Sequence, residues 1–220
     1  MAKVGLKYLK FGKLNEGKGK DGEDTYGQGY ILGKAIKADI NINKNDVKLY
    51  ADDALAETDK TFSNGSVSVE TSDISQENQV RLLGHSESDG EMIANTNDQA
   101  PYVGFGFYGS KKVDGKLKFR AVFFNKVQFG EPNDNNSTKG ETTTFNTETI
   151  EGTIMTNAKG RWKQEKTFDT EEEAMDYIDR KFETAQIEET SGKGSSNQIQ
   201  EETATSEEFE ETIELGGNEE

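Results

Sequence analysis

A two-residue hydrophobic period dominates the chain and limits its fold more than any other feature. In the stretch KAIKADINI, residues 34–42, the apolar residues share one face: Ile36, Ala38, Ile40 and Ile42. The polar residues share the opposite face: Lys37, Asp39 and Asn41. This alternation is typical of a β-strand with one side buried in a core and the other in contact with water.

The stretch YVGFGFYGSKKVDGKLKFRAVFFNKVQF, residues 102–129, predicts a β-hairpin that turns at Asp114 and Gly115. A two-residue loop would place the apolar faces of the two arms on opposite sides. We therefore expect a three-residue loop with Gly115 in the left-handed conformation, which sets Phe105 opposite Phe123 and Phe107 opposite Ala121. Glycines at 104 and 106 leave the other face nearly bare, so another group is expected to approach that backbone closely.

One further strand and two helices complete the pattern. FNTETIEGTIM, residues 145–155, predicts a strand with Ile150 and Ile154 toward the core. DTEEEAMDYIDRKF predicts a helix with a capping box formed by Thr170 and Glu173, and SDISQENQVRLLG predicts a second helix that ends at Gly84. The expected fold is mainly β, a sandwich or barrel-like sheet with one or two flanking helices.

Charge divides the chain of 220 residues into two parts. Residues 183–220 contain one Lys and twelve acidic residues, against a net charge of −16 for the whole chain. Only seven residues of this segment are apolar, too few to offset the entropy of ordering it. We expect a β domain over 1–182 and an acidic, flexible tail over 183–220, in which Phe209, Ile213 and Leu215 share an alternating face suited to docking as a strand.

Few residues of the sequence indicate a catalytic, cofactor or metal site. The chain has no cysteine, which excludes disulfides and thiolate metal sites, and it has no apolar run long enough for a signal peptide or a membrane span. The single histidine, His85, follows a helix-ending glycine with Ser86 and Asp89 nearby; a loop histidine is favoured over a hydrolase triad. GFGFYG is not followed by a helix, as a dinucleotide fingerprint would require. We expect no enzymatic activity, no cofactor and no metal.

The stretch LYADDALAET, residues 49–58, mixes acidic and apolar residues in a connection between strands. Asp52 and Asp53 are adjacent and no glycine follows, so the alternation of a calcium loop is missing. Leu49, Tyr50 and Leu55 among the charges suit contact with another subunit. A solvated loop remains the alternative.

Four motifs occur in a fixed order: YADD-x-LAE at 50–57, LLGH at 82–85, K-V-x-F at 126–129 and IEGTI at 150–154. In this order, and over roughly residues 1–182, the chain resembles the major tail protein of long-tailed bacteriophages and prophages, the subunit of the tail tube. The resemblance implies hexameric rings that stack into a tube, with strands of all protomers joined in one β-barrel around a channel for DNA. The implied mechanism is passive conduction, in which the protein makes or breaks no covalent bond.

The resemblance also implies positions and partners. The connection after the first long strand contacts a neighbouring subunit, which assigns an interface to Leu49, Tyr50, Asp52, Asp53, Leu55, Glu57 and Phe62. The polar face of Lys37, Asp39 and Asn41 is the expected wall of the channel. Expected partners are copies of the chain, the tape measure protein and the proteins at the tube ends, and DNA passes without specific binding. The expected location is the virion tail, and the host cytoplasm during assembly.

Two other functions fit the sequence. One is a tube component of a contractile injection machine, which conducts protein effectors. The other is a monomeric β-rich module whose exposed aromatic side chains bind carbohydrate.

Overall fold

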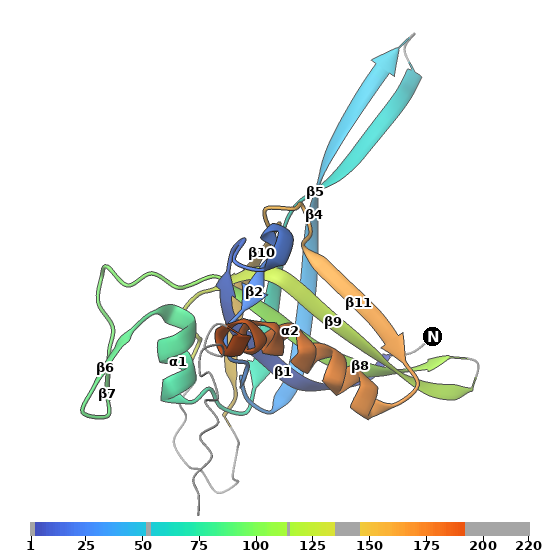
Figure 1. The fold of residues 1–220 in the computed structure, drawn as a ribbon. Helices are drawn as coiled ribbons and strands as arrows, with labels where there is room; N and C mark the ends of the chain where they lie inside the picture. Colours follow the sequence, from blue (N-terminus) through green and yellow to red (C-terminus); the bar gives the residue numbers. More distant parts are fainter. Residues whose placement is uncertain (1–2, 52–53, 114, 135–145, 192–220) are drawn as a thin grey trace, which may run out of the picture.

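The computed structural model describes residues 3–51, 54–113, 115–134 and 146–191 (Figure 1). The strands are β1 (Lys3–Asn15), β2 (Thr25–Tyr26), β3 (Tyr30–Ile31), β4 (Ala35–Ala51), β5 (Ala54–Thr71), β6 (Ser86–Ser88), β7 (Glu91–Ile93), β8 (Val103–Val113), β9 (Lys116–Phe129), β10 (Glu148–Met155) and β11 (Lys163–Phe168). The helices are α1 (Gln76–Leu83), α2 (Glu171–Ser191) and a short 3-10 turn, η1 (Lys20–Gly22).

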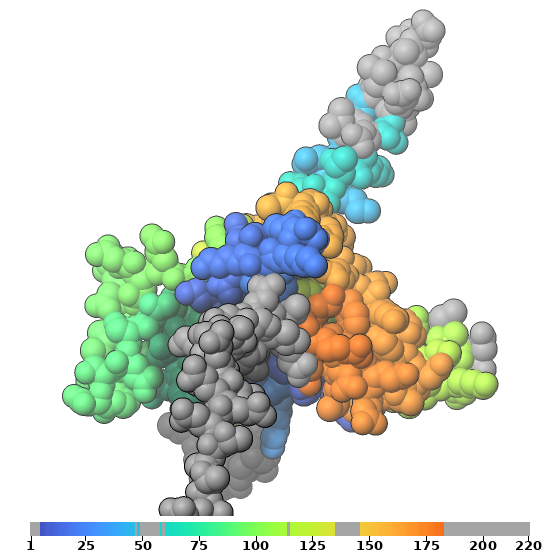
Figure 2. Space-filling model, viewed as in Figure 1, coloured from blue at the N-terminus to red at the C-terminus, as the bar shows by residue number. Residues whose placement is uncertain are grey.

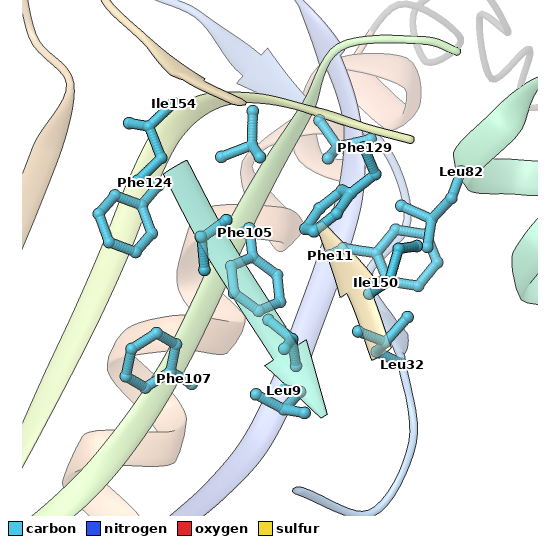
Figure 3. Close-up of a cluster of buried hydrophobic side chains, with 14 of the residues drawn as sticks. Leu9, Phe11, Leu32, Leu82, Phe105, Phe107, Phe124, Phe129, Ile150 and Ile154 are labelled. Carbon is cyan, nitrogen blue, oxygen red and sulfur yellow. The ribbon is translucent and has the colours of Figure 1, made fainter. Parts of the chain in front are cut away.

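Most strands belong to one antiparallel sheet in the order β2-β1-β8-β9-β10-β5-β4. β9 is long enough to pair with two strands on the same side: its first part pairs with β11 and its last part with β10. The sheet therefore divides at β9 and curls around a core that draws residues from β1, β5, β8, β9 and β10 (Figure 3). This confirms the predicted mainly β fold with helices at its flanks.

The β8–β9 hairpin differs from the predicted register. Val113 pairs with Lys116, so the loop has two residues, and Phe105 lies opposite Phe124 instead of Phe123. Gly115 does adopt the left-handed conformation, with φ of 79°. The expected three-residue loop is wrong because it assumed that one face of the hairpin is buried, whereas both faces are.

The first face of this hairpin belongs to the main core, and the second lies under α2. Phe105 and Phe124 point into the main core (Figure 3). Phe123 packs instead with Ile178 and Phe182 of α2 in a second core. Another side chain approaches the backbone closely at the glycines, as expected. A Cβ at Gly104 would lie 2.5 Å from the Tyr26 ring.

Both helices begin as their sequences predict, and α1 also ends as predicted. In α2 the Thr170 hydroxyl accepts a hydrogen bond from the Glu173 amide and the Glu173 carboxylate accepts one from the Thr170 amide, which is the expected capping box. In α1 the Ser75 side chain caps the first turn, and Gly84 closes the last with φ of 77°. α2 continues to Ser191, past the boundary predicted at 182.

Polar contacts fix α2 on the sheet in addition to its apolar stripe. Asp179 accepts hydrogen bonds from the Tyr8 hydroxyl at 2.7 Å and from Lys10 Nζ at 2.6 Å. At the start of the helix, Glu171 accepts hydrogen bonds from the Tyr108 hydroxyl and from Lys7. The helix is thus held at both ends of its buried face.

The apolar face of β4 is only partly buried, since Ala38 and Ile42 pack against the main core and Ile36 and Ile40 do not. β4 forms at KAIKADINI, but Ile36 and Ile40 are 48% and 41% exposed, and Ile42 is half-buried. β4 is the last strand of the sheet order, and no strand among the described residues pairs with its outer edge. The expected burial is wrong for Ile36 and Ile40 in the single chain because the facing layer stops short of them.

Candidate interaction surface

The β4–β5 hairpin projects far beyond the body of the protein (Figures 1 and 2). β10 accompanies β5 only between Gly65 and Thr71. Residues 43–51 and 54–64, here called the arm, therefore form a ribbon of two strands, and no third strand of the described part of the chain pairs with it. A two-stranded ribbon alone is marginally stable in water. The arm is thus a candidate surface for docking on another molecule.

The residues predicted to form an interface occupy this arm. Near its tip Leu49 pairs with Glu57 and Tyr50 with Leu55 along the ladder. Asp52 and Asp53 lie outside the described residues, between the two strands. The structure thus places four of the predicted positions at adjacent places of the ladder at the far end of the arm: Leu49, Tyr50, Leu55 and Glu57.

Phe62, which was also predicted at the interface, has a role within the chain. It lies at the base of the arm, where its ring stacks on Trp162 with ring centroids 4.6 Å apart and planes 6° from parallel. Trp162 immediately precedes β11, so this stack ties the arm to the opposite layer of the sheet. No sequence pattern indicates this pair, since the two residues are 100 positions apart.

An open groove of about 510 Å³ runs beside the base of the arm. We call it the edge groove. Apolar side chains from both layers line it: Leu6, Ile36, Ile40, Phe107, Val122 and Trp162. The alternation in β4 identified this apolar face, but only the structure shows that it borders a groove instead of a closed core.

Basic residues surround the apolar floor of the edge groove. Lys111, Arg120 and Lys163 line it. Arg120 and Lys163 both pair with Glu165, and the Arg120 guanidinium, followed by Lys163, holds the pKa of Glu165 below its usual range. The groove thus combines an apolar floor with a positively charged rim.

The polar face of β4 is open to solvent. Lys37, Asp39 and Asn41 are all exposed, as their alternation predicts. Lys37 and Asp39 form an ion pair along the strand, and the Asp39 carboxylate raises the pKa of Lys37. A substitution on this face would disturb no core contact.

His85 is a buried structural histidine in this fold. Its Nδ1 lies 2.8 Å from Asp98 Oδ2, and that oxygen also accepts a hydrogen bond from the Asn95 amide at 2.8 Å. Its Nε2 lies 3.1 Å from Glu131 Oε1, without the alignment of a hydrogen bond. The partner of His85 is therefore Asp98 and not the Asp89 considered from the sequence, and the contact ties loop 94–101 to the end of α1.

Within the described ranges, no group of three His, Asp or Glu side chains is arranged to hold a metal ion. Neither α1 nor α2 is long and apolar enough to cross a membrane. No protein-family model matches the chain, and no curated protein is significantly similar to it.

Proposed function

We propose that this chain is the structural subunit of a phage tail tube, which assembles into hexameric rings that stack around a channel for DNA. The observation that carries the proposal is the arm, a two-stranded ribbon that extends beyond the core of its own chain. The order of the motifs YADD-x-LAE, LLGH, K-V-x-F and IEGTI supports it independently.

Three features favour assembly over an isolated module. Among the described residues, no third strand pairs with the arm beyond its base. The outer edge of β4 is unpaired in the described part of the chain, and the apolar side chains beside it are exposed. Exposed edges of this kind promote association, and ring closure removes them.

The proposed mechanism is passive. DNA carries one negative charge for about every 1.7 Å of its axis, so a wall that bound phosphate would retard it. A net charge of −16 on each subunit gives the tube a field that phosphate does not adhere to. In this proposal the tape measure protein fills the channel before DNA, and end proteins close the tube.

Light scattering after size exclusion, followed by negative-stain microscopy of the full chain, tests the proposal. We expect rings or tubes once the protein is concentrated. Monomers at every concentration, also after addition of a tube-end protein, would contradict it. Monomers that also bind an immobilised glycan would favour the carbohydrate-binding alternative, and tubes filled with protein effectors would favour the injection-machine alternative.

A further inference from the structure

The edge groove lies between two free strand edges. β4 ends the sheet order, and β11 pairs only with β9 among the described residues. An additional strand beside β4 would gain backbone hydrogen bonds along its unpaired edge and would cover Ile36 and Ile40. Such additions of a strand are a recurrent mode of peptide recognition.

Two opposed lysines indicate the charge that the occupant should carry. Lys111 of β8 lies opposite Lys118 of β9 in the ladder. Like charges in directly opposite positions are unfavourable. Asp169 pairs with Lys118 at 2.6 Å. This lysine pair, together with the basic rim, favours an acidic occupant.

The chain contains a segment with this chemistry. Residues 207–215, EEFEETIEL, include five glutamates and no basic residue. Phe209, Ile213 and Leu215 fall on one face of an extended strand. The seven residues from Phe209 to Leu215 equal in number the seven from Ile36 to Ile42 on β4, so an extended segment matches the length of the apolar face.

The segment is within reach of the groove. Seventeen residues, 192–208, separate it from the end of α2. Extended, they span up to about 55 Å. A tether of this length holds the segment near the groove at an effective concentration on the order of 1 mM, well above that of a second copy in dilute solution.

We propose that residues 209–215 dock in the edge groove of their own chain as an added strand beside β4. Phe209, Ile213 and Leu215 cover Ile36 and Ile40, and Glu211, which the two-residue period puts on the same face, meets the basic rim. Docking shields the free edge of the subunit before it meets another chain. The inference concerns the free subunit and does not require that tubes form. The docking inference and the tail-tube proposal can therefore each fail without contradicting the other.

Hydrogen exchange of the dilute full chain, followed by mass spectrometry, tests the docking. We expect amides of 209–215 to exchange at least ~10-fold more slowly than those of 192–206. Ile40→Glu places a carboxylate on the groove floor and should abolish this protection. Asn41→Glu adds the same charge on the opposite face of β4 and should retain it. Both residues are exposed, so the fold should survive both changes.

A disulfide trap identifies the occupant, because the natural chain has no cysteine. In dilute protein, Ile40→Cys combined with Ile213→Cys should form an intramolecular bond faster than Asn41→Cys combined with Ile213→Cys. Equal exchange rates along the whole tail would overturn the proposal. So would protection that appears only on concentration together with disulfide-linked dimers, since the occupant would then be a second copy.

Discussion

Phe62 and Trp162 stack face to face, and this stack joins the base of the arm to the opposite layer of the sheet. We predict that Phe62→Ala lowers the free energy of unfolding by about 1–2 kcal/mol, because the half-buried ring loses its stacking partner and part of its buried area. It should also speed amide exchange in the arm. Urea unfolding and hydrogen exchange measure the two effects. Phe62→Tyr, which keeps the ring, is the control, and unchanged exchange in the alanine variant would show that the stack does not hold the arm.

The paired acids at the arm tip are predicted to serve assembly. Asp52→Ala with Asp53→Ala should reduce polymerisation and leave the thermal unfolding of the monomer unchanged. Sedimentation and calorimetry measure the two quantities. If the natural chain binds calcium and the double variant does not, the acids form a metal site instead.

The polar face of β4 is predicted to line the channel. Asp39→Lys removes the partner of Lys37 and places a ring of lysines in the tube. Tubes should still form because Asp39 is exposed, but DNA ejection should slow, and added salt should relieve the defect by screening. Glu87→Lys makes the same charge change at an exposed position on β6 and serves as the control. Equal ejection rates for both variants at low salt would place the channel elsewhere.

Asp98 should make stability depend on pH on the acid side. The Asn95 amide and then His85 hold the pKa of Asp98 below its ordinary value of 3.8. The ionised carboxylate therefore stabilises the fold above that value, and the contribution is lost as the pH falls through the lowered pKa. The Asp98→Asn variant lacks this stabilising contribution at every pH. The urea midpoints of the two proteins should differ at pH 6, and the difference should shrink as the pH falls below 3.8; a constant difference would contradict this role.

Close packing beneath α2 leaves no room for a side chain at Gly104. Gly104→Ala would put a Cβ 2.5 Å from the Tyr26 ring and 2.8 Å from Phe123, so we predict a loss of about 1–3 kcal/mol in the free energy of unfolding. Gly130→Ala is the matched control, since its nearest contact would be 3.8 Å away and its φ is not positive. A similar urea midpoint for both variants would show that the second core adjusts freely.

Local patterns predicted the parts of the fold that depend on neighbouring residues. The capping box at Thr170 and the terminating Gly84 depend on residues only a few positions away, and both helices formed as expected. The strand at Ile150 and Ile154 also formed with both side chains buried. In each case the sequence contains the whole set of interactions that decides the local structure.

Features that depend on distant layers were not predictable in this way. Alternation cannot reveal that a helix covers the second face of a hairpin, so Phe105 was set opposite Phe123 when it pairs with Phe124. Nor can it show how far the facing layer extends, so Ile40 was assigned to a core that does not reach it. The edge groove and the Phe62 stack arise only when β4 and β5 meet Trp162 in space.

The second core sets an order of events during synthesis. Phe123 is translated 59 residues before Phe182, the side chain of α2 that covers it. At about 5–20 residues per second, the ribosome needs roughly 3–12 s to make the intervening chain. Throughout that interval α2 cannot cover Tyr26 and Phe123, which lie buried beneath it in the finished protein.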